Sequence, residues 1–164
     1  MLALLVAECA PDVYLRLTGT DSALRSIEFV GQDDLSSAEA GDSSANPIVR
    51  ESLRQLRAYF AGELREFNLP LDPQGSEFQK RVWRQLQTIP FGEIRSYAQV
   101  AEAIGSPRAV RAVGAANGAN PLAIVVPCHR VIGSSGRLVG YGGGLPLKKR
   151  LLDLEGCNLS LFRA

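Results

Sequence analysis

Alternation of apolar and polar residues near the start of the chain predicts a small sheet. Residues 2–8 and 13–17 have the composition of short strands, with Pro11-Asp12 between them. A third strand is expected over residues 26–30, after a turn marked by Gly19 and Asp21.

The pattern then changes to that of a loop and a helix. Residues 31–46 are rich in Asp, Ser, Ala and Gly, which predicts a surface loop. Pro47 opens a predicted helix in which apolar side chains recur at helical spacing as far as Phe60. These segments carry no chemistry that we recognise, and we interpret them as a small α/β unit.

Residues 68–75 hold two prolines and one glycine, and they are the best candidate for a domain boundary. Directly after them, Ser76 is placed to cap a helix over residues 77–87, with Gln79 as the second member of a capping box. We therefore predict two domains, 1–75 and 76–164.

Two further predicted helices are joined by a tight turn. Ser96 can cap the first, and Gly105 ends it. We expect Ser106 to cap the second, with Pro107 in its first position, and the helix to continue over residues 108–117. A helix, a short turn with Gly and a second helix form the pattern of a helix-turn-helix.

The second of these helices has very small side chains. Apart from Arg108, Arg111 and the valines, its residues are nearly all Ala or Gly. Such a helix either packs closely against its own domain or enters a narrow groove, such as the minor groove of DNA, which is about 6 Å wide. In the second case Arg111 is placed to push into the base stack or to contact phosphates.

An apolar run over residues 122–126 leads directly to Pro127-Cys128-His129-Arg130. We interpret it as a buried strand that ends at the proline, so that the thiol lies between a rigid support and the Gly/Ser residues 133–136. The thiolate is the reactive form of cysteine, and a nearby imidazole lowers the thiol pKa. Neighbouring residues on a strand point to opposite faces, so contact between Cys128 and His129 requires a turn or a bridging water. The alternative is a structural cysteine packed as a small apolar residue.

Composition narrows the classes of function. Apolar residues make up 46% and charged residues 21% of the 164, as in an ordinary globular protein. No apolar run approaches the roughly 20 residues that span a bilayer, and the first residues fit a strand better than a signal peptide. Residues 77–164 carry twelve Lys and Arg against five Asp and Glu, an excess of seven that is compatible with a polyanion partner.

The three cysteines, Cys9, Cys128 and Cys157, are too widely spaced for a disulfide framework, which indicates a reducing compartment and a cytoplasmic protein. Together with the single histidine they match no usual zinc-ligand spacing. We expect no metal and no other cofactor.

Taken in order, these motifs resemble those of the O6-alkylguanine-DNA alkyltransferases, which are single-turnover DNA repair proteins. The matching segments are FQKRVW (78–83), IPFGE (89–93), SY (96–97), RAVG (111–114), NP (120–121), IVVPCHRV (124–131), YGGGL (141–145) and LEG (154–156). The resemblance implies an α+β fold, with a small N-terminal α/β (ribonuclease-H-like) domain and a mostly helical C-terminal domain with a helix-turn-helix.

The resemblance also implies the reaction. An alkyl group on O6 of guanine, and also on O4 of thymine, moves irreversibly to Cys128 and consumes the protein. Double-stranded DNA, bound through its minor groove, is the implied partner. The reacting nucleotide has to leave the base stack, at a cost on the order of a few kcal/mol.

The implied catalytic group centres on Cys128. His129 acts on the thiol through a water, while Glu155 holds the imidazole and favours its charged form. Asn120 links the second helix to the active-site turn. Tyr97 helps to turn the nucleotide and donates a hydrogen bond to guanine.

By the same resemblance, Arg111 fills the place that the nucleotide leaves in the stack. The implied DNA-contacting residues are Ser96, Tyr97, Arg108, Arg111 and Ala112. The implied guanine pocket is lined by Val131, Tyr141, Gly142, Gly143 and Lys148. Some members carry Ser at position 142 and Pro at position 123, where this chain has Gly142 and Ala123, so a hydroxyl contact from position 142 is absent.

Three other classes compete with this interpretation. A non-catalytic alkyltransferase-like lesion-binding protein would lack the reactive cysteine, which is present here. A transcription factor would carry base-reading side chains on the second helix, where Ala and Gly predominate. A cysteine hydrolase would turn over, whereas a thioether on Cys128 would not.

Overall fold

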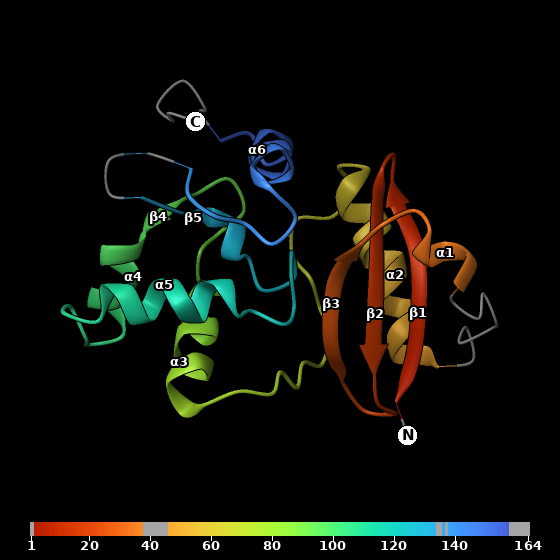
Figure 1. The fold of residues 1–164 in the computed structure, drawn as a ribbon, viewed down its shortest axis with the longest axis horizontal. Helices are drawn as coiled ribbons and strands as arrows, with labels where there is room; N and C mark the ends of the chain where they lie inside the picture. The colour runs from red at the N-terminus through yellow and green to blue at the C-terminus, as the bar shows by residue number, and fades with distance from the viewer. Residues whose placement is uncertain (1, 38–45, 134–135, 137, 158–164) are drawn as a thin grey trace. The chain divides into compact units, whose positions relative to one another are not determined.

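The computed structural model describes residues 2–37, 46–133, 136 and 138–157, which belong to two compact units. The first comprises Met1–Gln74 with Pro121–Ala123, and the second comprises Gly75–Asn120 with the residues from Ile124 onward. Figure 1 labels their helices and strands. No helix within the described residues is long and apolar enough to cross a membrane.

The first unit is built on a three-stranded antiparallel sheet in the order β1-β2-β3 (Figure 1). The strands are β1 (Ala3–Ala10), β2 (Val13–Gly19) and β3 (Leu24–Val30). They lie where the alternation predicts them, each longer by one or two residues. Alternate residues of β2 are buried, so one face of the sheet turns toward a core.

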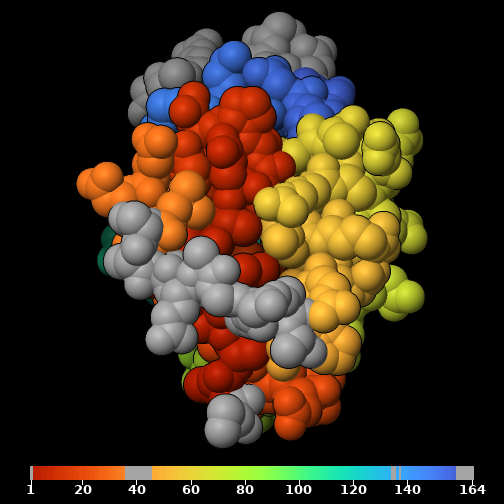
Figure 2. Space-filling model, turned by 90° about the vertical axis from the view of Figure 1, so that its right-hand side faces the viewer, coloured from red at the N-terminus to blue at the C-terminus, as the bar shows by residue number. Residues whose placement is uncertain are grey.

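Helix α2 (Pro47–Phe60) packs against this sheet, and Figure 2 shows it lying beside β1. The predicted start is confirmed, since Pro47 is the first helical residue and the Asn46 side chain accepts a hydrogen bond from the Val49 amide at 3.0 Å. The buried apolar side chains of this unit include Leu15, Leu17, Leu24, Ile27, Val49, Leu56 and Tyr59.

The predicted loop over residues 31–46 contains a short helix, α1 (Asp34–Ser37). The Asp34 carboxylate accepts a hydrogen bond from the Gly31 amide at 2.8 Å, which favours a helical turn at this point. The prediction was therefore wrong for these four residues. Residues 38–45 lie outside the described part of the chain.

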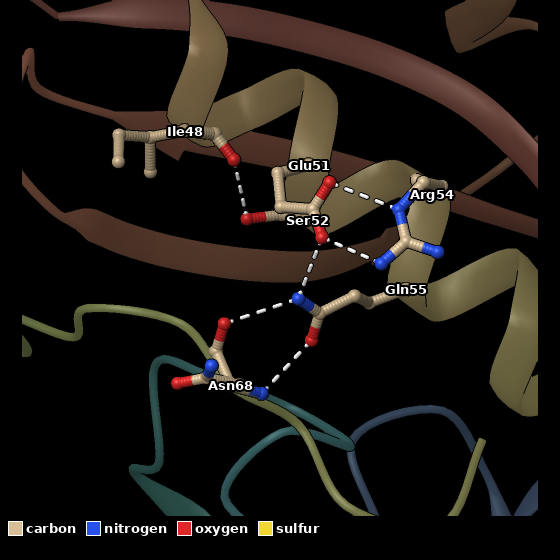
Figure 3. Close-up of polar contacts among 6 residues, drawn as sticks. All are labelled: Ile48, Glu51, Ser52, Arg54, Gln55 and Asn68. Atoms are coloured by element: carbon tan, nitrogen blue, oxygen red, sulfur yellow. Dashed lines mark hydrogen bonds and ion pairs between the residues drawn. The ribbon is translucent and has the colours of Figure 1, made fainter.

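The buried Gln55 side chain of α2 holds the later segment at Asn68 in place, and Figure 3 shows this contact with its neighbours on the helix. Gln55 donates to the Asn68 carbonyl at 3.0 Å and accepts from the Asn68 amide at 2.9 Å. Glu51 accepts from Gln55 at 2.9 Å and from Arg54, while the Ser52 hydroxyl donates to the Ile48 carbonyl at 2.7 Å. Because Gln55 uses both ends of its amide, its burial leaves no polar atom without a partner.

The outer edge of β3 is covered by two later segments. Leu24 donates to the Pro70 carbonyl at 2.8 Å and its carbonyl accepts from Asp72 at 2.9 Å. Ile27 donates to the Pro121 carbonyl at 2.7 Å and forms a bridge with Leu122. The hydrophobic pattern did not predict that residues 121–123 belong to this sheet.

The second unit is mostly helical. Its elements are α3 (Glu77–Leu86), β4 (Arg95–Ser96), α4 (Tyr97–Ala103), α5 (Val110–Gly118), the 3-10 helix η2 (Cys128–Arg130), β5 (Val131–Ile132) and α6 (Leu145–Leu154). Strand β4 pairs in parallel with β5. Helices α3 and α4 both pack against α5.

The predicted capping box at Ser76 is present, and the predicted cap Ser96 forms a second capping box that was not predicted. Ser76 accepts from the Gln79 amide, and the Gln79 side chain accepts from the Ser76 amide. Ser96 and Gln99 do the same at the start of α4. Gly75 cannot be replaced without rearrangement, because a Cβ there would lie 2.5 Å from the Trp83 ring.

The start of the second helix of the pair was predicted at Pro107, three residues too early. Helix α5 begins at Val110, and its N-cap Ala109 provides no side-chain hydrogen bond. Ser106 is not a cap, because its carbonyl accepts from the Ala109 amide at 2.9 Å in the turn that precedes the helix. Pro107 and Arg108 lie in this turn.

Candidate active site

Cys128 lies in a buried turn rather than after a strand. Residues 122–126 form isolated bridges and a turn, so the predicted strand is wrong. The reason is local: Ile124 has φ 73, a left-handed conformation that breaks an extended run and is rare for a β-branched residue. Cys128 begins η2 and is 7% exposed, with its amide bonded to the Val126 carbonyl at 2.8 Å.

Asn120 fastens this turn from the preceding segment. Its Nδ2 donates to the Val126 carbonyl at 2.8 Å, two residues before the thiol. Hydrogen bonding by Asn120 also acts to lower the pKa of Cys128. Asn120 therefore holds the backbone next to the nucleophile and also acts to lower the pKa of its thiol.

A buried group of charged side chains lies next to the thiol. His129 Nε2 is 2.7 Å from Glu155 Oε2, and both side chains are fully buried. Arg130 donates to Glu155 Oε1 at 2.6 Å and to Oε2 at 3.0 Å. A third guanidinium nitrogen donates to the Ile89 carbonyl at 2.7 Å. Burial raises the pKa of Glu155, but hydrogen bonds from His129 and Arg130 outweigh it and hold the value at about 2.

The tautomer of His129 follows from these contacts. Because the Glu155 carboxylate accepts from Nε2, the proton is on Nε2 and the Nδ1 lone pair is free to act as a base. Nδ1 has no hydrogen-bond partner among the described residues. Burial lowers the pKa of His129, and Arg130 and Lys148 lower it further against the opposing effect of Glu155. Glu155 does favour the charged form of the imidazole, as expected, but burial outweighs this effect and leaves the ring neutral.

The thiol of Cys128 is also uncharged at rest. Burial raises its pKa, and this effect exceeds the lowering by Asn120 and Lys148. Proximity to an imidazole predicts an ionised thiolate, but the burial of Cys128 disfavours that charged form. A base that takes the proton during the reaction is required instead.

Lys148 is a fully buried cation near this thiol. Its Nζ donates to the Val131 carbonyl at 2.7 Å and to the Val139 carbonyl at 3.0 Å. Burial lowers the pKa of Lys148 to about 8, and Cys128 acts to raise it. The side chain therefore joins the two ends of the segment between Val131 and Val139, and places positive charge toward the sulfur.

Tyr97 and Asn117 complete the surroundings of Cys128. Tyr97 begins α4 and is half-buried, and burial, with a smaller contribution from Cys128, raises its pKa. Asn117, on α5, is 5% exposed and donates through Nδ2 to the Cys128 carbonyl at 3.4 Å. Its Oδ1 has no partner among the described residues, at a typical cost of about 1–3 kcal/mol. The sequence analysis did not single out Asn117, and it assigned no role to Arg130. The signal that could have identified Asn117 is its position three residues before Asn120.

The other predicted residues lie on the surface of the same unit. Arg111 and Ala112 are exposed on the first turn of α5, and Arg108 is exposed in the preceding turn. An open hollow in this turn is lined by Ser106, Pro107, Arg108 and Ala109. Ser96 uses its hydroxyl as the α4 cap, at 3.1 Å from the Gln99 amide.

The glycine-rich segment before α6 forms a tight turn. The Tyr141 carbonyl accepts from the Gly144 amide at 2.9 Å, with Gly142 and Gly143 between them. Gly142 is exposed and Gly143 half-buried. Residues 134, 135 and 137 of the segment before it lie outside the described part. Over the described residues, no group of three or more His, Cys, Asp or Glu could hold a metal ion.

With this geometry established, comparison with known proteins identifies the family. Two family models match: the DNA binding domain of 6-O-methylguanine DNA methyltransferase over residues 77–157, and its ribonuclease-like domain over residues 10–73. The chain belongs to the 6-O-methylguanine DNA methyltransferase family. The resemblance stated from its motifs and the predicted fold class are both confirmed.

The similarity to individual relatives extends along nearly the whole chain. A methylated-DNA–protein-cysteine methyltransferase of Mycolicibacterium paratuberculosis is 56% identical over 89% of this chain and 88% of its own length. One from Methanosarcina acetivorans is 50% identical over 85% of this chain and 90% of its own. The crystal structure of Mycobacterium tuberculosis OGT in complex with DNA matches with a TM-score of 0.79 and 45% identity, covering 97% of this chain and 94% of that one.

Proposed function

We propose that this protein repairs DNA by taking an alkyl group from O6 of guanine onto its own Cys128, once and irreversibly. The observation that carries the proposal is the buried turn in which the thiol is followed by His129, whose Nε2 is fixed by Glu155 at 2.7 Å. The names of the relatives favour this reaction over a non-catalytic, alkyltransferase-like role. O4-alkylthymine is a second proposed substrate.

In the proposed reaction the Cys128 proton passes through a water to Nδ1 of His129, the basic nitrogen of the neutral ring. The thiolate attacks the alkyl carbon in line, so that an S–C bond forms while the C–O6 bond breaks. The electron pair of that bond goes to the departing guanine, which ends as the neutral base with the proton that the thiol lost. Lys148 stabilises the sulfur charge while it exists. A thioether has no leaving group under these conditions, so the protein acts once.

The proposed mode of DNA binding uses α5 in the minor groove. The small side chains of α5 allow close approach, and Arg111 takes the place of the extruded nucleotide. The proposed further contacts are Ser96, Tyr97, Arg108 and Ala112 with DNA, and Val131, Tyr141, Gly142, Gly143 and Lys148 with the base. Asn120 and Tyr97 act at the reacting centre. The proposed domains are residues 1–75 and 76–164. The protein is proposed to work in the cytoplasm and without a cofactor.

Mapping the product tests the proposed reaction directly. The full chain is incubated with duplex DNA that contains O6-methylguanine with a labelled methyl group, and the peptides are analysed by mass spectrometry. We expect one labelled methyl per chain, on Cys128, and unmodified guanine in the DNA. Label on another residue, or more methyl groups released than chains present, contradicts the proposal.

Replacing Arg111 separates base extrusion from chemistry. We expect Arg111→Ala to slow repair of duplex DNA by roughly 10²-fold, because the vacated stack is left unfilled. Reaction with free O6-benzylguanine, which needs no extrusion, should stay within about twofold. The measurement is the single-turnover rate on each substrate, with Arg84→Ala on the exposed face of α3 as the control. Equal losses on both substrates would exclude an extruding role for Arg111.

A further inference from the structure

Arg130 is buried and uses each nitrogen of its guanidinium. Nε donates to Glu155 Oε1 at 2.6 Å, Nη2 donates to Glu155 Oε2 at 3.0 Å, and Nη1 donates to the Ile89 carbonyl at 2.7 Å. The guanidinium carbon also lies 5.8 Å from the centre of the Phe91 ring, within range of a cation–π contact. These contacts need a flat, forked donor, which a lysine ammonium does not provide. The residue after His129 is therefore a positive charge with a fixed position.

The carboxylate of Glu155 is shared between Arg130 and the imidazole. Its Oε2 accepts from Arg130 and also lies 2.7 Å from His129 Nε2. The side chains of Glu155 and His129 are fully buried and that of Arg130 is 8% exposed, so these charges are screened little by salt. One buried anion and one permanent cation therefore balance each other, and a charged imidazole would add positive charge with no anion of its own.

The charged groups that face the ring of His129 come from η2 and α6. Burial lowers the pKa of His129, Glu155 at the end of α6 acts against this, and Arg130 and Lys148 add to the lowering. The Cys128 thiol, also on η2, is uncharged at rest. Helix α3 packs against η2 as well, but its charged side chains are exposed or half-buried and none of them shifts the pKa of His129. They are Glu77, Lys80, Arg81 and Arg84.

Removing the guanidinium would leave the Glu155 carboxylate buried without its permanent cation. The imidazole can then supply the missing charge by taking a proton from solvent, which turns the contact into an imidazolium–carboxylate pair. That proton would go to Nδ1, which is buried and has no hydrogen-bond partner among the described residues. A protonated Nδ1 cannot accept the proton of the thiol.

We propose that Arg130 is a positioning residue for alkyl transfer, which binds both oxygens of Glu155 and thereby keeps Nδ1 of His129 unprotonated and ready to take the thiol proton. The bidentate contact also holds the carboxylate in the orientation that fixes Nε2. The inference rests on the proposed function, and it assigns to Arg130 an effect that acts through His129.

The histidine ring allows a direct measurement, because the chain contains one histidine. Its ring signals are followed by NMR in the untagged full chain from about pH 5 to about pH 9, the range in which a histidine titrates. In the unsubstituted protein we expect a ring that is neutral at about pH 7, with its proton on Nε2. In Arg130→Met, which removes the charge from a side chain of similar length, the midpoint should rise by at least about one pH unit. Arg130→Lys, which keeps the charge, should raise it by less than about half a unit.

The same shift should appear in the rate of repair. Single-turnover transfer from O6-methylguanine DNA at saturation should fall on the acidic side as the ring gains a proton, and this limb should lie about one pH unit higher in Arg130→Met. Below both midpoints the variant should be roughly tenfold slower than the unsubstituted chain, and above both the rates should agree within about threefold. A side chain that only supported the fold would change the rate equally at every pH.

A second substitution separates charge balance from packing. Glu155→Gln in the Arg130→Met background removes the unbalanced carboxylate and still offers an oxygen to Nε2, so the ring midpoint should return to that of the unsubstituted chain or below it. Arg84→Met on the exposed face of α3 removes a guanidinium that does not face the ring, and it should change neither the midpoint nor the rate. If Arg130→Met does not fold, Arg130→Gln takes its place.

Three results would each overturn the inference. They are a ring already charged at about pH 7 in the unsubstituted protein, a midpoint that moves by less than about 0.3 unit when the charge of Arg130 is removed, and an equal loss of rate at every pH. The ring titration needs neither DNA nor methyl transfer. Its outcome is therefore separate from that of the proposed function, which methyl transfer to Cys128 by the unsubstituted protein tests.

Discussion

Cys128→Ala abolishes methyl transfer while leaving DNA binding in place. The variant lacks the only atom that can form the new S–C bond, so we expect a loss of at least ~10³-fold, to the limit of detection. Its affinity for duplex DNA should change no more than about threefold, because the proposed DNA contacts Arg108, Arg111 and Ala112 are exposed whereas the thiol is buried. Transfer of labelled methyl and a binding isotherm at fixed salt are the two measurements.

The other two cysteines provide matched controls. Burial raises the pKa of Cys9 to about 12, so its thiol does not ionise under working conditions. Cys157 packs against the cluster formed by Ile132, Leu138 and Leu152. Cys9→Ala and Cys157→Ala should each transfer at the normal rate. Retained transfer in Cys128→Ala, or its loss in either control, would place the acceptor elsewhere.

Among single substitutions of His129, Arg130 and Glu155, Glu155→Ala should lower the free energy of unfolding the most. It leaves the Arg130 guanidinium, whose side chain is 8% exposed, without its carboxylate, and leaves His129 Nε2 without an acceptor. Breaking a buried ion pair from one side costs about 3–5 kcal/mol, which corresponds to a fall in Tm of roughly 6–20 °C. Thermal and urea unfolding of the full chain measure it.

An exposed ion pair in the same unit is the control for this change. Glu93 pairs with Arg95 at 3.2 Å, with side chains 51% and 37% exposed. Glu93→Ala should therefore cost no more than about 1 kcal/mol. Similar losses of stability in the two variants would mean that the contacts of Glu155 with His129 and Arg130 stabilise the fold no more than a surface ion pair does.

The pH dependence of the Glu155 contribution has a definite sign. The folded pKa of about 2 lies below the ordinary glutamate value of about 4.3, so the ionised carboxylate stabilises the fold above that ordinary value. The stability difference between the unsubstituted chain and Glu155→Gln should be constant above about pH 5 and should shrink as pH falls toward 2. A difference that grows on acidification would contradict the assignment of charge.

Elements with strong local signals were predicted well from the sequence. The capping box at Ser76 and the N-cap at Ser96 depend only on residues within one turn of the helix start, and both are present. The helix from Pro47 and the alternating strands follow from period and turn residues alone. In the same way, the motif around Cys128 identified the family before any geometry was known.

What the sequence did not predict depends on partners far along the chain. Residues 121 and 122 are apolar because they add to the edge of β3, and periodicity alone cannot distinguish that from a strand before Cys128. The neutral forms of His129 and Cys128 depend on burial, which the nearest neighbours in the sequence do not report. Asn117 looks like any helical asparagine until α5 is placed beside the thiol.

The bond from Trp83 to the Ala116 carbonyl has a practical consequence. The chain contains a single tryptophan, so its tryptophan fluorescence comes from one ring. That ring is 2% exposed and its indole nitrogen is bonded to the backbone of α5, one residue from Asn117. The unlabelled protein thus carries its own optical probe of the helix that holds Arg111, and a shift of that emission to longer wavelength signals that water has reached the seam between α3 and α5.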